Sequence, residues 1–434
     1  MNYSMLKIGE KLKSTLEITY VVTGCLGSGG QGEVYEVVAG NRHYALKWYH
    51  VHMATSVQRK RIQDLVQKGS PDERFLWPMD YIETNESFGY IMPIRPTHYK
   101  SIIDLMKRKA EPTFDTLCKI GYELADCFQK LHSLGYAYGD LSFGNTFFDA
   151  KTGDVLICDN DNVVINGQDE MSVQGTIGFM APEIVRGEKG PSTQTDLFSL
   201  AVLLFYIFMM HHPLEGAKEA KIKCLDLAAR EKLYGKEPLF IWDSEDDSNR
   251  PIAGYQDNAI IYWGFYPKFF KELFMTSFTK GLHNPKERIV ENQWKRAFLQ
   301  LKESMMICPK CGVEIFYNGE AQLGTRPTCW GCHQSLEYPM ILALPKGKIV
   351  LKSNTVIYRH HLDSEFDLTN KILEVTRHPK DPNKWGLKNQ TGSDLVVTKE
   401  DGTQMIVPSE KSFLFVPGMQ ILFKQGQKGY ITRG

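Results

Sequence analysis

The stretch YGDLSFGN at residues 138–145, followed by the strand-like run VLICD at residues 155–159, decides how this chain is interpreted. It places a carboxylate, Asp140, and a carboxamide, Asn145, five positions apart in a loop, and the later run ends on a second carboxylate, Asp159. These side chains offer hard oxygen donors, which suit a magnesium ion bound to phosphate. A carboxylate in such a loop can also accept a proton from a hydroxyl group.

The chain around this stretch changes from strand-rich to helix-rich. Residues 20–47 alternate as a strand, a glycine cluster, a strand, a turn and a strand, and residues 75–93 predict another antiparallel pair. Residues 113–132 carry apolar side chains at helical spacing. A short helix is predicted earlier, at 55–68, and further helices are predicted at 195–211, 216–233, 267–280 and 291–303. The pattern therefore predicts a five-stranded sheet lobe followed by a helical lobe.

A glycine loop lies between the first two predicted strands. Gly27, Gly29 and Gly32 follow GxGxxG spacing, with Val34 two residues later. Glycine is needed where backbone must approach phosphate oxygens closely. Glycine loops in hairpins are common, so the motif alone is weak. Its strand-to-strand setting excludes the dinucleotide-binding fold, which requires a helix after the glycines.

Lys47 ends the run YALK, 15 residues beyond the last loop glycine. An isolated lysine on a strand is usually a solvated edge residue. A lysine that follows such a loop can instead reach the α- and β-phosphates of a nucleotide.

Together these motifs resemble a eukaryotic-like (Hanks-type) serine/threonine protein kinase over about residues 20–300. The resemblance implies a bilobal α+β fold and ATP, with magnesium or manganese, as cofactors. It implies that Asp140 is the catalytic base, acting with Lys47, and that Asn145 and Asp159 bind the metal. The ATP-binding residues that it implies are Gly27, Gly29, Gly32, Val34, Ala45, Lys47, Met92 as gatekeeper and the hinge residue Arg95.

The same resemblance covers three structural positions and the activation segment. Glu183, in the motif APE, is expected to pair with Arg288. Asp196 is expected to tie down the loop around Asp140. Thr176 belongs to the end of the activation segment.

Some positions depart from the family pattern around the predicted catalytic loop. Tyr138-Gly139 replaces a histidine-arginine pair, so no arginine is present there to bind a phosphorylated activation loop. Ser142 stands where most protein kinases have a lysine, which predicts slower transfer because one positive charge is missing from the transition state.

Other departures concern Lys47 and the metal aspartate. Asn160-Asp161 replaces phenylalanine-glycine after Asp159, and Asp161 is a competing candidate ligand. No glutamate occurs between Lys47 and residue 73. The partner of Lys47 is therefore left open between Asp64 and an amide such as Gln63.

Four of the nine cysteines form two CxxC pairs, Cys308/Cys311 and Cys329/Cys332, separated by 17 residues. This spacing is typical of a zinc ribbon with four thiolate ligands, a closed site that predicts a structural role. His333 is interpreted as a surface residue.

The predicted domains are a kinase domain at 1–303, a zinc ribbon at 304–338 and a β-sandwich at 339–434. The kinase lobes are predicted at about 15–92 and 97–303. The last domain is predicted from short apolar runs separated by turns. It vaguely resembles a forkhead-associated domain, with Arg359 as the candidate phosphate-binding residue, although a plain interaction module fits as well.

Composition and targeting signals bear on location and partners. The 51 basic and 51 acidic residues give no bulk attraction to nucleic acid or membrane. The N-terminal residues lack a secretory signal, and the apolar run at 197–210 is shorter than the ~20 residues that span a bilayer. A cytoplasmic protein is expected, with protein substrates as partners.

The segment at 238–289 resembles a bacterial kinase branch often encoded beside a metal-dependent phosphatase and a von Willebrand-type protein, including in tellurium-resistance clusters. This resemblance suggests those two proteins as partners. Two other functions stay open. One is a pseudokinase scaffold that binds nucleotide and recruits partners, and the other is a small-molecule phosphotransferase, which the APE segment disfavours.

Overall fold

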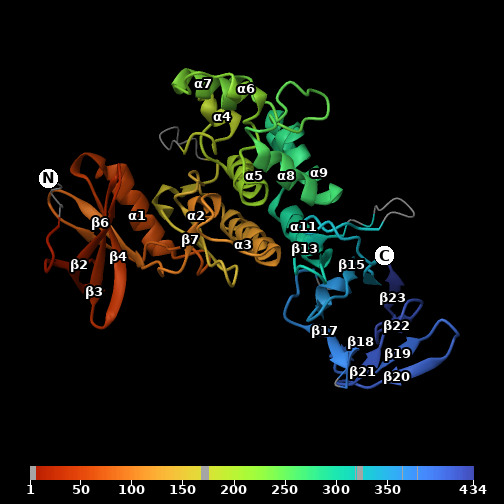
Figure 1. Cartoon of the computed structure of the whole chain (residues 1–434). Coiled ribbons are helices and arrows are strands. Elements are labelled where there is room, and N and C mark those ends of the chain that lie inside the picture. The colour runs from red at the N-terminus through yellow and green to blue at the C-terminus, as the bar shows by residue number, and fades with distance from the viewer. Residues whose placement is uncertain (1–5, 168–174, 318, 320–325, 364, 379) are drawn as a thin grey trace. The chain divides into compact units, whose positions relative to one another are not determined.

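A computed structural model describes residues 6–167, 175–317, 319, 326–363, 365–378 and 380–434 (Figure 1). The chain divides into two compact units. The first comprises Met1–Pro112, Lys119–Trp263 and Glu272–Lys295, and the second comprises Thr113–Cys118, Gly264–Lys271 and Arg296–Gly434. Among the described residues, no helix combines the length and apolarity needed to cross a membrane.

The first unit begins with an antiparallel sheet in the strand order β1-β2-β3-β4-β6-β5. Its buried face is formed mainly by large apolar and aromatic side chains, among them Tyr35, Leu46 and Ile91. A short strand, β1, adds to the five predicted strands. The strands are β1 (Lys11–Lys13), β2 (Thr19–Ser28), β3 (Gly32–Ala39), β4 (Arg42–Tyr49), β5 (Asp80–Glu83) and β6 (Phe88–Pro93).

Helix α1 (Ser56–Lys68) lies in the chain between β4 and β5, as the sequence predicted. Thr55 caps it, because its side chain accepts a hydrogen bond from the backbone N–H of Gln58. Ile62 and Leu65 form its buried stripe. The opposite face stays polar, so the helix is amphipathic.

The rest of the first unit is mainly helical (Figure 1). Its most apolar helix, α5, has nearly every side chain buried, which confirms the interpretation of that run as a core helix. The other helices of the chain are α2 (Ile102–Met106), α3 (Phe114–Ser133), α4 (Pro182–Val185), α5 (Thr193–Met209), α6 (Ala217–Ala220), α7 (Leu227–Glu231), α8 (Asp257–Phe265), α9 (Lys268–Phe278), α10 (Lys280–His283) and α11 (Glu291–Glu303). Parts of α3, α8, α9 and α11 belong to the second unit. Five short strands accompany them: β7 (Lys100–Ser101) with β9 (Thr146–Phe148) and β10 (Val155–Ile157), and β8 (Tyr136–Ala137) with β11 (Val164–Ile165). Single turns form η1 (Val51–Met53), η2 (Asn160–Asn162), η3 (Lys232–Lys236) and η4 (Pro285–Glu287).

The prediction of one helix over residues 216–233 is wrong. The structure has two short helices there, α6 and α7, separated by residues 221–226. Asp226 has an extended backbone, and its side chain accepts a hydrogen bond from the N–H of Ala229. A capping aspartate begins a new helix, and therefore interrupts the predicted one.

His132, in the last turn of α3, makes a buried charged contact within the first unit. Its imidazole is 3.1 Å from Asp196 Oδ2 and also contacts the carboxylate of Glu291. Burial lowers the pKa of His132, but the hydrogen bonds to Asp196 and Glu291 outweigh burial and raise it to about 9. The protonated form is therefore favoured in the folded protein.

This contact predicts a pH-dependent stability. A histidine pKa raised above its ordinary value contributes stability that is fully present below about pH 6.5 and is lost as pH rises through about 9. We expect the thermal unfolding midpoint to fall across that window, with a contribution of up to about 3 kcal/mol. The measurement is the unfolding midpoint from pH 6 to 10. His132→Gln should flatten the profile, and an equally steep profile in that variant would contradict the assignment.

The second unit contains a β-sandwich after a short hairpin. The hairpin pairs β12 (Met305–Ile307) with β13 (Glu314–Phe316). Apolar side chains of both sheets, such as Leu342 and Leu387, share one core. One sheet has the order β15-β14-β23-β22-β19-β20 and the other the order β16-β17-β18-β21. The strands are β14 (Met340–Leu344), β15 (Gly347–Val350), β16 (Val356–Tyr358), β17 (Lys371–His378), β18 (Asp381–Asn389), β19 (Leu395–Thr398), β20 (Gln404–Val407), β21 (Ser412–Leu414), β22 (Gln420–Leu422) and β23 (Lys428–Arg433), and η5 (Arg359–His361) follows β16.

Two segments from earlier in the chain pack with the hairpin inside the second unit. The ring of Phe114 lies 5.1 Å from that of Phe316, and Phe265 stacks on Trp330 at 4.8 Å. The carboxylate of Glu314 accepts a hydrogen bond from the N–H of Phe114 at 2.5 Å. The cysteine-rich segment is therefore packed against residues that precede the predicted boundary at 304.

Candidate active site

The glycine loop is formed by the β2–β3 hairpin. Gly27 pairs with Val34, and Val34 pairs in turn with Lys47 on β4. A Cβ at Gly32 would lie 2.1 Å from the carbonyl oxygen of Trp48, so strand packing requires glycine at that position. A Cβ at Gly27 would meet no atom within 4 Å, and one at Gly29 only a carbonyl at 4.0 Å. Backbone at these two positions is therefore open to a ligand.

Lys47 is buried and lies among polar groups from two other segments of the chain. Its Nζ is 2.5 Å from Asp159 Oδ1, 2.8 Å from Asp161 Oδ2 and 2.9 Å from Gln31 Oε1. Burial alone would lower the pKa of Lys47, but the two carboxylates raise it. The ammonium group is therefore held in its charged form, as binding of phosphate requires.

Asp161 is the partner of Lys47 that the sequence left open. Its side chain is fully buried, whereas that of Asp159 is 36% exposed. The hydroxyl of Tyr49 donates to its carboxylate, and Gln58 Nε2 of α1 donates to its carbonyl at 3.0 Å. Lys47 is therefore linked to α1 through Asp161 and Gln58.

The two side chains proposed from the sequence as partners of Lys47 are placed elsewhere. Gln63 Nε2 donates to the hydroxyl of Tyr81 at 2.7 Å, and Asp64 is exposed. The signal in the sequence for this partner is Asp161 itself, an acidic residue two positions after Asp159. The sequence alone suggested a competing metal ligand at that position.

The segment after β10 is fixed by Asn160. Its side-chain amide is buried and donates to the carbonyls of Leu76 at 2.9 Å and Ile157 at 3.1 Å. Asp159 itself has a left-handed backbone, with φ 56°. Such a conformation costs of order 1–3 kcal/mol for a residue other than glycine, and the buried contacts of its neighbours hold it.

Asp140 lies in the loop between β8 and β9. The N–H and the hydroxyl of Thr176 both donate to Asp140 Oδ1 at 2.9 Å. Asn145 Nδ2 donates to the carbonyl of Asp140 at 2.8 Å and lies 3.5 Å from its Oδ2. Burial raises the pKa of Asp140, and the hydrogen bonds from Thr176 oppose that rise.

Two further contacts hold the loop and the segment after Thr176. Asp196 accepts hydrogen bonds from the N–H groups of Tyr138 at 2.5 Å and Gly139 at 3.0 Å. Arg288 donates to both carboxylate oxygens of Glu183 at 2.8 Å, and this pair is buried. A bidentate pair of this kind fixes orientation as well as charge.

The predicted hinge lies at the end of β6. Met92 is buried and pairs with Ala45 of β4. The guanidinium of Arg95 lies 4.1 Å from the centre of the Phe147 ring and donates to the carbonyl of Tyr99 at 3.0 Å. The structure thus brings the predicted gatekeeper and Ala45 together on adjacent strands.

These features define a protein kinase fold and site, and comparison with known proteins agrees. The protein kinase domain family matches residues 20–260, more than half of the chain. The chain therefore belongs to the protein kinase domain family.

Three curated relatives illustrate the similarity. A probable serine/threonine-protein kinase PLK of Dictyostelium discoideum is 26% identical over 201 residues, 44% of this chain and 20% of the relative. Ribosomal protein S6 kinase alpha-4 of Homo sapiens is 26% identical over 225 residues, 45% and 27% of the two chains. A probable serine/threonine-protein kinase CCRP1 of Zea mays is 25% identical over 198 residues, 44% of this chain and 31% of the relative. The chain spans a fifth to a third of the length of these relatives.

The second unit brings the four cysteines of the CxxC pairs together. The sulfur atoms of Cys308 and Cys332 are 3.7 Å apart, and those of Cys311 and Cys329 are 3.5 Å apart. Four sulfurs around zinc at ~2.3 Å would be separated by about 3.8 Å, so this group fits the ion. Backbone N–H groups of Cys311 and Lys310 lower the pKa of Cys308 to about 6, which favours its thiolate.

Zinc binding by this group predicts a large effect of cysteine substitution. Structural zinc contributes about 10–16 kcal/mol to the folding of small zinc modules. Cys308→Ser should lose the ion and make the hairpin around β12 sensitive to protease, as measured by zinc content and limited proteolysis. Cys224→Ser, at an exposed cysteine, is the matched control. Equal zinc content in both variants would contradict the assignment.

Two residues near these modules were also singled out. His333 is exposed, as interpreted, and lies outside the four-sulfur group. Arg359, the candidate phosphate-binding arginine, pairs with both carboxylate oxygens of Asp363 at 3.0 and 3.1 Å. A phosphothreonine would have to displace this carboxylate.

Proposed function

We propose that this chain transfers the γ-phosphoryl group of ATP to serine or threonine hydroxyls of protein substrates. One observation carries the proposal. The ammonium of Lys47 contacts Asp159 across 112 residues of sequence, and Asp161 holds it there. This arrangement places a phosphate-binding cation beside a partly exposed carboxylate.

Each side chain then has a role in the transfer. Lys47 would bind the α- and β-phosphates, and Gly27 and Gly29 would offer N–H groups from the open side of the hairpin. Asn145 and Asp159 would hold magnesium or manganese, which when bound neutralises charge on the phosphates. Asp161, being fully buried, would remain with Lys47 as its positioning partner.

Asp140 would act as the base for the substrate hydroxyl. Thr176 occupies its Oδ1, which leaves Oδ2 with only the longer contact to Asn145 among the described residues. A raised pKa makes the carboxylate a better proton acceptor. Asp196 would position the loop through the N–H groups of Tyr138 and Gly139.

The contacts also bear on regulation. Glu183 and Arg288 would anchor the end of the activation segment, and Asn160 would keep Asp159 in place in every state. Because Asn160 is bonded to two buried carbonyls, we do not propose a swinging switch at this position. Residues 168–174 lie outside the described part of the chain.

A pseudokinase scaffold is the rival function, and Ser142 favours it. This serine is buried where a transfer lysine is expected, so one positive charge is absent. Under that reading the chain would bind nucleotide without turnover. The four-cysteine group would bind structural zinc under either reading, and the β-sandwich would recruit partners.

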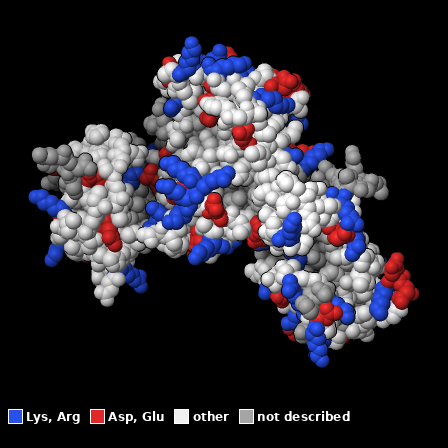
Figure 2. Space-filling model, in the orientation of Figure 1, with Lys and Arg blue, Asp and Glu red and all other residues white. Residues whose placement is uncertain are grey.

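The resemblance to kinases of phosphatase and von Willebrand-type gene clusters suggests those two proteins as partners. The mixed surface charge gives no support to nucleic acid, since Lys and Arg occur together with Asp and Glu on the face shown in Figure 2.

Purified protein incubated with γ-labelled ATP, with and without magnesium, tests the proposal. We expect magnesium-dependent, acid-stable label on serine or threonine. Loss of the label in Asp159→Asn would support the metal assignment. Label on tyrosine alone, or on small molecules alone, would contradict the proposed substrate class.

A further inference from the structure

The second unit contains a cluster of potential metal ligands that the kinase site does not use. Glu303 ends α11, and His360 and His361 follow β16 in η5. One oxygen of Glu303 lies 2.8 Å from His361 Nε2 and 3.6 Å from His360 Nε2. All three side chains are largely buried, with exposed fractions of 14%, 11% and 3% for Glu303, His360 and His361.

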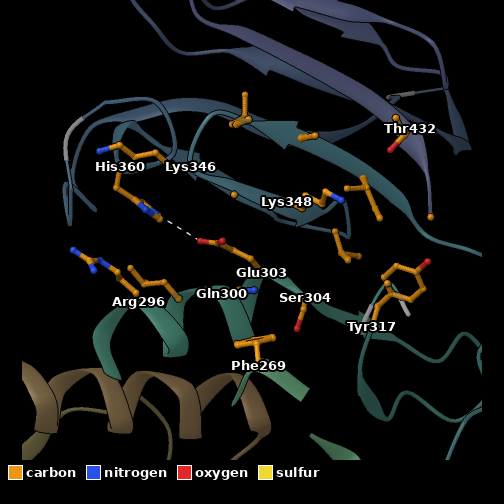
Figure 3. Close-up of a pocket in the computed structure, with 18 of the residues that line it drawn as sticks. Phe269, Arg296, Gln300, Glu303, Ser304, Tyr317, Lys346, Lys348, His360 and Thr432 are labelled. Carbon is orange, nitrogen blue, oxygen red and sulfur yellow. Dashed lines mark ion pairs between the residues drawn. The ribbon is translucent and has the colours of Figure 1, made fainter. Parts of the chain in front are cut away.

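Glu303 and His360 line a cavity of about 1030 Å³. Figure 3 shows His360 and Glu303 pointing toward each other across one end of this cavity. Lys348 and Ser304 are among its other lining residues. The three ligand atoms lie within 4.8 Å of one another, and two of the three residues face this accessible space.

The position of Glu303 calls for a nearby cation. A helix C-terminus carries partial negative charge, so a carboxylate in the last turn is unfavourable there without a positive partner. Within the described part of the chain, the carboxylate of Glu303 pairs with the two imidazoles of His360 and His361. The ring centres of these imidazoles are only 3.7 Å apart, which disfavours two protonated rings.

The chemistry of the two rings suits a metal. The Nε2 atoms of both rings face the same carboxylate oxygen of Glu303. His361 Nδ1 is 3.0 Å from the carbonyl of Tyr358, closer than the 3.3 Å to its N–H. A ring that donates from Nδ1 to a carbonyl presents the lone pair of Nε2, the usual arrangement of a metal-binding histidine.

The distances fit a tetrahedral ion. Nitrogen and oxygen ligands at ~2.0–2.2 Å from zinc are separated by about 3.4 Å, and the two observed separations, 2.8 and 3.6 Å, lie on either side of that value. We propose that Glu303, His360 and His361 form a binding site for a divalent transition metal ion of the zinc type. Three protein ligands leave one position toward the cavity, where water or an anionic group would bind.

This site is separate from the four-cysteine group and independent of the proposed kinase activity. With both sites filled, the full chain should bind two zinc ions. Glu303 would then join the end of α11 to η5 through the metal. The ordinary alternative is a plain hydrogen bond between Glu303 and a histidine, with no ion.

The test is zinc stoichiometry of the full chain after chelation and reloading with zinc ion alone. We expect two equivalents in the wild type and one in His360→Ala, with affinity for the second ion weakened at least ~100-fold. Lys348→Ala, which lines the same cavity, and His333→Ala, which removes an exposed histidine, should keep both. Cobalt substitution distinguishes the sites, because only the cysteine site gives thiolate charge-transfer absorption.

Folding is checked separately, since His361 is buried. His360→Ala should keep the thermal midpoint of the zinc-free wild type, and Glu303→Gln should repeat its loss of zinc. One equivalent in the wild type under zinc excess would overturn the proposal. So would equal zinc content in the wild type and in both ligand variants.

Discussion

Replacing Asp140 by asparagine is expected to reduce phosphoryl transfer by roughly 10²–10⁴-fold, the usual contribution of a general base. Asparagine keeps the shape of the side chain and can still accept hydrogen bonds from Thr176 at the position of Oδ1. It cannot take a proton from the substrate hydroxyl. Nucleotide affinity should therefore stay within about twofold of the wild type, a change in binding free energy of no more than ~0.4 kcal/mol.

The measurement is the transfer rate at saturating ATP, together with nucleotide binding to the same preparation. Asp154→Asn is a matched control, because this exposed carboxylate lies just before β10 and pairs with Lys119 rather than with site residues. It should transfer phosphate at the wild-type rate. Undiminished transfer in Asp140→Asn would remove Asp140 from the role of base.

Replacing Asp161 by asparagine is expected to lower transfer efficiency by at least tenfold. Removing one partner of a buried ion pair costs about 3–5 kcal/mol, and tenfold corresponds to about 1.4 kcal/mol. The smaller figure applies because Lys47 keeps Asp159 and Gln31. The KM for ATP should rise and kcat should fall, because Lys47 would lose its fixed position.

A second readout separates positioning from a general structural effect. With Asp161 neutralised, Lys47 would pair more strongly with Asp159, the proposed metal ligand. Half-saturation by magnesium should therefore shift to higher concentration in Asp161→Asn. Asp64→Asn is the control, since Asp64 is exposed on α1 and was one of the two candidate partners from the sequence. An impaired Asp64→Asn beside a normal Asp161→Asn would reverse the assignment.

The fold was predictable because its signals are local or strongly periodic. Strand and helix patterns, the glycine loop and the YGDLSFGN stretch indicated the sheet lobe, the helical lobe and most site positions. Arg288 and Glu183 could be paired because their motifs are distinctive. The paired cysteines likewise indicated a four-sulfur group, and the structure brings those sulfurs together.

Other features depend on contacts between distant residues. The partner of Lys47 could not be read from helical spacing, because a buried tyrosine hydroxyl and Gln58 hold Asp161 in the place of a helix glutamate. The break before α7 depends on how Asp226 caps that helix. The cluster of Glu303 with His360 and His361 joins residues about 58 positions apart and leaves no spacing motif.

The central claim is transfer from ATP to a protein hydroxyl, and a single-turnover measurement tests it most directly. Protein with confirmed occupancy by γ-labelled ATP and magnesium is mixed with a panel of protein substrates, and acid-stable label is followed over time. The account predicts label on serine or threonine in the wild type and labelling that is at least about 10²-fold slower in Asp140→Asn. Full nucleotide occupancy without any transferred label would contradict it and would favour the scaffold.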